Sequence, residues 1–185
     1  MRNTMLRKGL CLALLLGTML SNPAFAQSPK SWTTVGSAGT VNDEDTALVE
    51  LGGGGIARLE NSAPAGTTAH IRYNVVAVDG LFGLGSPKRM RVRYQDNGSD
   101  AQVTVQLFEY DFANGGAPNL LMDFDSNNFA SAPQLQTRSL NACGVEFDFT
   151  NKVYYLEVTL SRSAATGYPM LAAIQLSALP GSCAP

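Results

Sequence analysis

Apolar and polar residues alternate along much of the chain with a period of two. The stretches 90–94, 101–107 and 154–161 each carry an apolar residue at every second position, as Val92 and Tyr94 show in the first. This period is typical of strands in antiparallel sheets that bury one face. The pattern therefore predicts one shared apolar face, formed by Val92, Tyr94, Val103, Val105, Leu107, Leu156, Val158 and Leu160.

Shorter apolar segments between turn-rich pieces predict further strands. They are 47–51, 56–59, 67–78, 120–124, 135–140, 144–149 and 170–177. The Asn97-Gly98 pair predicts that residues 90–110 form a hairpin. Only residues 43–51 could begin a short helix, with Asp43 as its cap. The pattern as a whole predicts an all-β, antiparallel, jelly-roll-like β-sandwich of about nine or ten strands.

The N-terminal 26 residues have the layout of a cleaved secretory signal. Basic residues precede an apolar run at 10–20, and Ala24-Phe25-Ala26 precedes Gln27. The run is shorter than the roughly 20 residues that a membrane anchor needs. We therefore expect residues 1–26 to be removed and the protein to be secreted or periplasmic. Residues 27–185 would form one domain, in which 27–40 is either a mobile arm or a first edge strand.

Signal removal changes both the cysteine count and the charge. Cys11 leaves with the signal, so Cys143 and Cys183 remain, and an even pair in an exported chain predicts a disulfide. Removing 26 of the 185 residues leaves 159, and three of the 13 basic residues are lost, which moves the net charge from −2 to −5. A mildly acidic domain has no electrostatic reason to bind nucleic acid or anionic lipid. We expect neither nucleic-acid binding nor membrane insertion.

The residue inventory argues against common catalytic sites. The chain has one histidine, His70, which the alternation places on a polar strand face with Arg72. A catalytic triad needs a base beside its nucleophile, and a catalytic zinc site draws on several histidines or thiolates. The glycine run 52–55 lacks the Lys-Ser or Lys-Thr pair of a phosphate loop. We therefore expect a non-catalytic domain without a cofactor.

Calcium is the one metal that the inventory leaves open. Asp123, Asp125 and Asn127 place oxygen donors at alternate positions, as the start of a calcium loop does. The loop departs from an EF-hand because Asn128 and Gln134 stand where glycine and glutamate are required. These three residues are therefore weak calcium candidates beside the simpler reading of a solvated turn.

Two sets of side chains are candidates for binding surfaces. Four aromatic residues could reach the surface and contact a sugar, namely Trp32, Tyr110, Tyr155 and Tyr168. An arginine stripe at outward positions comprises Arg72, Arg91 and Arg93, with Lys88 and Arg89 just before. For this stripe we expect cross-strand charge pairs with residues such as Glu109 and Glu157.

The last strands, at 154–158 and 172–176, loosely resemble the jelly-roll carbohydrate-binding modules. The resemblance covers the final third of the chain and includes no diagnostic motif. It implies an exported module that binds a glycan or another extracellular ligand. The alternative is a structural or assembly subunit of the cell surface or envelope, which would expose a long unpaired edge strand or an apolar patch to a protein partner.

Overall fold

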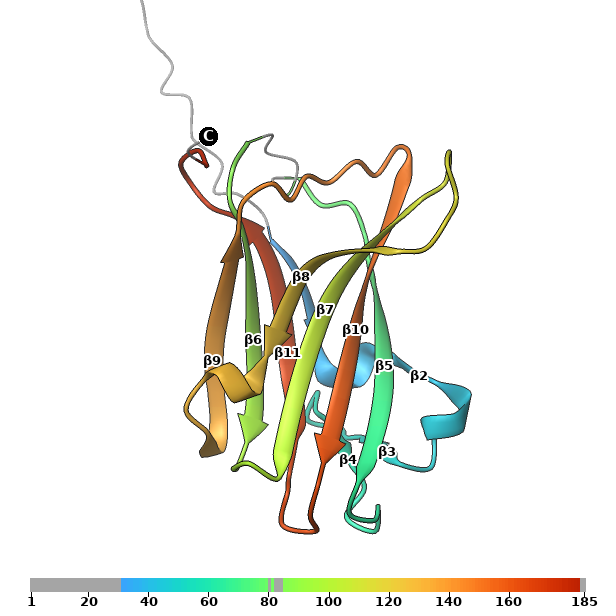
Figure 1. Cartoon of the computed structure of the whole chain (residues 1–185), viewed down its shortest axis with the longest axis vertical. Coiled ribbons are helices and arrows are strands. Elements are labelled where there is room, and N and C mark those ends of the chain that lie inside the picture. The colour runs from blue at the N-terminus through green and yellow to red at the C-terminus, as the bar shows by residue number, and fades with distance from the viewer. Residues whose placement is uncertain (1–30, 80, 82–84, 184–185) are drawn as a thin grey trace, which may run out of the picture.

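Two antiparallel β-sheets face each other in this protein (Figure 1). The structure is a computed structural model that describes residues 31–79, 81 and 85–183. The expected all-β sandwich is confirmed, with 11 strands and three single-turn 3₁₀ helices in the described part. The expected signal, 1–26, lies outside the described residues. Within the described part, no helix is both long and apolar enough to cross a membrane.

Each sheet contains strands from both halves of the chain. Sheet A has the order β3-β4-β11-β6-β9, with β1 also paired to β11, and sheet B has the order β2-β5-β10-β7-β8. The sheet A strands are β1 (Trp32–Val35), β3 (Val49–Leu51), β4 (Ala57–Leu59), β6 (Lys88–Asp96), β9 (Ala132–Ala142) and β11 (Met170–Ala178). The sheet B strands are β2 (Thr40–Val41), β5 (Thr67–Val75), β7 (Ala101–Asp111), β8 (Asn119–Asp125) and β10 (Lys152–Arg162).

Strands β4 to β11 have the connectivity of a jelly roll. They alternate between the orders 4-11-6-9 in sheet A and 5-10-7-8 in sheet B. Most consecutive strands therefore lie in opposite sheets, as the crossing loops in Figure 1 show. Two such four-stranded sheets, each contributing one apolar face, enclose a single core.

The predicted hairpin at 90–110 is wrong. Strand β6 pairs with β9 and β11, whereas β7 pairs with β8 and β10, so the turn at 97–100 crosses between the sheets. The alternation could not show this, because a hairpin and a crossing bury the same alternate residues. A period of two indicates which face of a strand is buried and carries no information on its partner.

The predicted apolar face is buried as expected. Val92 and Tyr94 project from sheet A toward the sheet B residues of the set, and none of the eight is measurably exposed to solvent. The ring of Tyr94 packs edge-on against Phe124 of β8, with 5.3 Å between the ring centroids. The alternation thus identified the core correctly although it misassigned the strand pairing.

Two local predictions were wrong for different reasons. Residues 144–149 form no strand, although Val145 and Phe147 are buried, because a loop that packs under its own side chains shows the same alternation. The region 43–51 forms no α-helix. It contains the 3₁₀ turn η2 (Asp43–Asp45), where no side chain caps the first turn, and then β3. Gly52 follows β3 directly and limits the length of any helix here.

The start of the described chain adds two strands that the alternation did not reveal. Of the stretch 27–40, for which an arm or an edge strand was expected, Trp32–Val35 forms β1 against β11. Residues 36–38 form the 3₁₀ turn η1, and Thr40 begins β2 against β5. Residues 27–30 lie outside the described part. Beginning at Trp32, this segment therefore contributes to both sheets.

The predicted disulfide is present between Cys143 and Cys183, whose Cα atoms lie 5.7 Å apart. It joins the end of β9 to the tail that follows β11. The backbone N–H of Cys183 also donates to the carbonyl of Gly85, at 3.1 Å. The tail after the last strand is therefore held at the same end of the sandwich as the β9–β10 loop.

We expect the domain to lose stability at alkaline pH. Burial raises the pKa of four tyrosine hydroxyls above its usual value of about 10. They are Tyr73, Tyr94, Tyr154 and Tyr155. Groups whose folded pKa is raised contribute stability that is complete below the unfolded pKa and is lost as the pH rises through the folded pKa. Unfolding by urea should therefore need less denaturant above about pH 10.

Tyrosinate absorbance followed against pH, together with far-UV circular dichroism, checks this prediction. The absorbance change should coincide with the loss of β-structure. Titration of all tyrosines near pH 10 in a fully folded protein would contradict it.

Candidate functional site

The outer face of sheet B carries polar and aromatic side chains in ordered rows. The alternation that buries Ile71 and Tyr73 of β5 turns Arg72 and Asn74 outward. Across the sheet, Asn74 lies opposite Tyr155, and Tyr155 lies opposite Phe108. The next row is Arg72, Glu157 and Gln106, and the third is His70, Thr159 and Thr104.

Tyr155 is held between two neighbours at the centre of this face. The ring of Phe108 stacks on it at a centroid distance of 5.3 Å with an interplanar angle of 18°. From the adjacent strand on the other side, the guanidinium of Arg72 lies 5.8 Å from the ring centroid. Arg72 is held in turn by Glu157, with 3.2 Å between the guanidinium and the carboxylate. The ring faces are therefore occupied, and the ring edge and hydroxyl of Tyr155 remain for a ligand.

A groove crosses this face beside the aromatic row. One hollow of about 640 Å³ lies over β2 and β5, and a second of about 290 Å³ lies over Tyr155. Arg72 and Asn74 line both hollows, so the two adjoin. The first is also lined by Thr34, Ala38, Thr40, Val41, Asn42, Asp43, Glu44 and Tyr73, and the second by Val153 and Tyr154.

The wall of the larger hollow is attached to the sheet through His70 and Asp45. The buried carboxylate of Asp45 accepts a hydrogen bond from the backbone N–H of His70 at 2.8 Å and lies 3.0 Å from its Nδ1. The backbone N–H of Asn42 donates to the carbonyl of His70, at 3.2 Å. These contacts position the η2 turn, which presents Asp43 and Glu44 to the groove. His70 lies on the polar face with Arg72 as expected, but its contact with Asp45 could not be seen in the sequence.

The groove can satisfy a ligand that has many hydroxyl groups. Asn42 and Asn74 offer amides that both donate and accept, and the carboxylates of Asp43 and Glu44 accept hydrogen bonds. Val153, which is 41% exposed, adds apolar surface next to the edge of Tyr155. An open groove with alternating polar and apolar contacts suits an extended ligand better than a compact apolar one.

The four aromatic candidates do not form one platform. Tyr155 lies in the groove, and Tyr110 lies on the same face opposite Val153, where its ring contacts Phe112 edge-on at 6.2 Å. Tyr168 lies in the turn between β10 and β11, where its hydroxyl accepts a hydrogen bond from Arg58. The prediction that Trp32 reaches the surface is wrong. It is only 6% exposed, because β1 pairs with β11 and turns this ring inward with Leu176.

Of the three calcium candidates, Asp125 is engaged within the protein. Asp125 accepts hydrogen bonds from the side chain of Gln102 at 3.0 Å and from the backbone N–H of Asn127 at 2.9 Å, so it caps a 3₁₀ turn. Asp123 is exposed on β8, and Asn127 is exposed beyond it. In the described residues, no three histidine, cysteine, aspartate or glutamate side chains gather in a way that could hold a metal.

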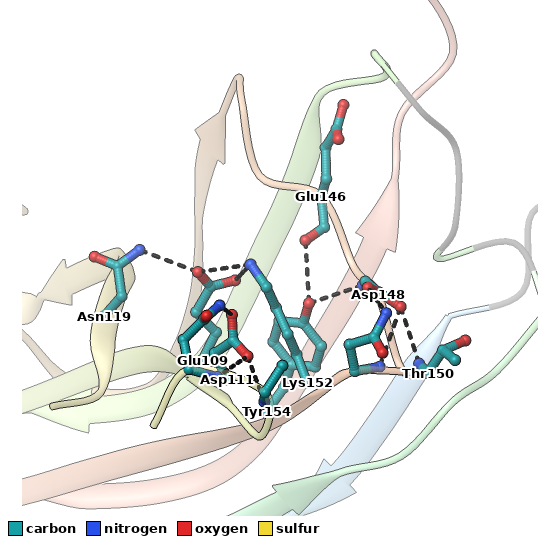
Figure 2. Close-up of polar contacts among 11 residues, drawn as sticks. Glu109, Asp111, Asn119, Glu146, Asp148, Thr150, Lys152 and Tyr154 are labelled. Carbon is teal, nitrogen blue, oxygen red and sulfur yellow. Dashed lines mark hydrogen bonds and ion pairs between the residues drawn. The ribbon is translucent and has the colours of Figure 1, made fainter. Parts of the chain in front are cut away.

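A cluster of polar contacts lies at the end of sheet B where the β7–β8 and β9–β10 loops meet (Figure 2). Lys152 lies at its centre, with Nζ 3.0 Å from both carboxylate oxygens of Glu109. Tyr154 is below it. Its hydroxyl accepts a hydrogen bond from the backbone N–H of Asp148 and donates to the carbonyl of Glu146.

Two loops of this cluster share one geometry. Asp111 accepts hydrogen bonds from the backbone and the amide side chain of Asn114, and Asp148 does the same with Asn151. These hydrogen bonds lower the pKa of both aspartates, and Asn114 and Asn151 supply the largest contributions. The carboxylates here are bound within the protein, and the cluster stabilises the two loops.

The sequence pointed to Tyr155 and missed most of the groove. Asn42 follows the two-residue β2, Asp43 and Glu44 belong to the single-turn η2, and Asn74 is an ordinary polar position on a strand. The one available signal was the outward position of Arg72 and Asn74 in the alternation of β5. The groove forms only when β2 is added at the edge of sheet B.

No family model matches this chain, and no curated protein matches its sequence. Solved structures are similar to it at low sequence identity. A xylan-binding module, CBM15, is 9% identical, with a TM-score of 0.47 over 84% of this chain and 100% of that one. The C-terminal CBM6 of LamC, a laminarinase from Zobellia galactanivorans, is 10% identical, with a TM-score of 0.46 over 80% and 99% of the two chains. These likenesses concern the β-sandwich fold alone.

Proposed function

We propose that this protein is an exported, non-catalytic module that binds a neutral glycan chain along the groove of sheet B. The observation that carries the proposal is that two adjoining hollows meet at Arg72 and Asn74, beside the edge of Tyr155. Sugars present hydroxyl groups around small apolar C–H patches. A groove with amides, carboxylates and an aromatic edge matches that alternation.

Preorganisation supports this proposal. Arg72 is held by Glu157 and by the ring of Tyr155, so little side-chain freedom is lost when a ligand binds. Asp45 holds the η2 turn against His70. A neutral sugar has no net charge to attract it to the protein, so its binding depends on prepositioned groups. Each hydrogen bond contributes only about 1 kcal/mol after desolvation.

The absence of catalysis is part of the proposal. Glu109 is paired with Lys152 at 3.0 Å, so this carboxylate is not offered to a substrate as a free acid or base. Export is supported by the disulfide and by the layout of residues 1–26.

Affinity electrophoresis in gels containing neutral polysaccharides tests the proposal. Xylan, a mixed-linkage glucan and a mannan serve as probes, and retardation reports binding. Asn74→Ala should weaken the binding about tenfold, and Tyr155→Ala by at least as much, because each removes a group that faces the groove. Gln134→Ala on β9, which is exposed on the other sheet, is the control and should bind like the wild type.

Equal retardation of the wild type and both groove variants would contradict the proposed site. A wild type that binds none of the three probes would contradict the proposed function. Thermal melts of each variant separate loss of binding from loss of fold, since Asn74 is exposed and Tyr155 is half-buried.

The assembly role also has one observation in its favour. Strand β9 is 11 residues long and forms the end of sheet A, so no described strand pairs with its outer edge. An unpaired edge of this length can accept a strand from a partner. A dimeric mass by light scattering, in a preparation that binds no glycan, would favour assembly over glycan binding.

A further inference from the structure

Three arginines project from the outer face of sheet A, opposite the groove. Arg89, Arg91 and Arg93 occupy alternate positions of β6, so their Cα atoms follow one another at roughly 6.5–7 Å along the strand. Strand β6 lies between β9 and β11, which places the row on an interior strand beside the end strand β9.

These arginines have only neutral partners among the residues that the structure describes. Arg89 donates to the side chain of Asn141 at 3.2 Å, Arg91 to Gln175 at 3.4 Å and Arg93 to Thr137 at 3.5 Å. The expectation of cross-strand charge pairs is therefore confirmed only for Arg72. It is wrong for the other three, because they lie on the outer face of sheet A, whereas Glu109 and Glu157 belong to sheet B.

The neighbouring positions on β9 and β11 are uncharged. Arg93 lies between Thr137 on β9 and Ala173 on β11, and Arg91 lies between Ser139 and Gln175. The missing side-chain volume at Ala173 leaves a hollow of about 300 Å³, which Arg91 and Arg93 line together with Thr33. No carboxylate lines this hollow.

We propose that this face binds a polysaccharide that carries one carboxylate per sugar. A guanidinium donates two parallel N–H groups to a planar carboxylate, and such charge-assisted pairs are stronger than the neutral contacts that the arginines now make. The hollow beside Ala173 accommodates a sugar ring between two arginines. The hydroxyl of Thr33 and the amide of Gln175 meet its hydroxyl groups.

The charge balance favours a uronate chain over a more highly charged polymer. The whole chain has 15 acidic and 13 basic residues, so the basic row is a local feature on an acidic domain. A densely charged polymer such as a nucleic acid gains affinity by neutralising many phosphates, and three cations provide little of that. A chain with one charge per sugar needs few cations, and the acidic surface repels it less than it repels a densely charged polymer.

This site is independent of the groove. It uses sheet A, whereas the proposed neutral-glycan site uses Arg72, Asn74 and Tyr155 of sheet B. Substitutions on one face leave the other intact, so the two proposals can fail separately.

Isothermal titration calorimetry with polygalacturonate at low ionic strength tests the inference. The double variant R91Q/R93Q should lower the affinity about tenfold or more, since two charge-assisted pairs are lost. R91K/R93K should recover only part of it, because lysine keeps the charge and loses the paired donors. R58Q is the control and should bind like the wild type, since Arg58 is already paired with Glu50 at 2.6 Å.

Methyl-esterified polygalacturonate, which has lost its carboxylate charge, should not bind. Equal affinity for the ester, unchanged affinity of R91Q/R93Q or no binding by the wild type would each overturn the inference. Equal or tighter binding of dextran sulfate or duplex DNA would show that this face binds polyanions without selectivity. That result would also overturn the inference. The N74A variant should bind polygalacturonate normally, which separates this result from the test of the groove.

Discussion

Replacing Val105 with aspartate is expected to unfold the domain. Val105 is fully buried on β7, between Val158 of β10 and Phe124 of β8. The carboxylate would stand among apolar side chains, since both residues in register with it are apolar. A buried unpaired charge costs several kcal/mol, and domains of this size are stable by only about 5–15 kcal/mol.

Urea unfolding followed by far-UV circular dichroism measures the effect. Thr159→Asp is the matched control, because Thr159 lies on the central strand β10 but faces outward between Thr104 and His70. That variant should unfold close to the wild-type midpoint. If V105D unfolded at the same urea concentration as T159D, the assignment of Val105 to the core would be wrong.

The second large effect is expected from the disulfide. Replacing Cys143 and Cys183 with serine should lower the free energy of unfolding by up to about 4 kcal/mol, given their sequence separation of 40. The bond closes a loop that includes β10 and β11, so its loss lets the unfolded chain gain conformational entropy. In the folded state, the tail would keep its backbone hydrogen bonds to the segment before β6, such as that from Leu179 to Pro87 at 2.8 Å.

The midpoint of urea unfolding, with and without a reducing agent, checks this expectation. Reductant should shift the wild type toward the double serine variant and leave that variant unchanged. A wild-type midpoint that is insensitive to reductant, with the cysteines shown by mass to be reduced, would contradict it.

How far the sequence predicted the candidate site depends on which residue is considered. Tyr155 and Arg72 were identified because they occupy outward positions on long, regular strands. Asn42, Asp43 and Glu44 were not identified as parts of a groove, because they flank a two-residue strand whose pattern is too short to read. Trp32 was placed at the surface because an aromatic residue in a short segment has no neighbours in sequence that reveal its direction.

The sequence by itself determined which face of each long strand is buried, and hence the core and the fold class. That information is local, since side chains alternate along a strand whatever strand lies beside it. Only the tertiary structure decided the pairing. It separated β6 from β7, and it placed Arg72 beside Glu157 but Arg91 and Arg93 among neutral side chains. Strand pairing depends on contacts between residues far apart in the chain, so a local alternation of apolar and polar residues cannot encode it.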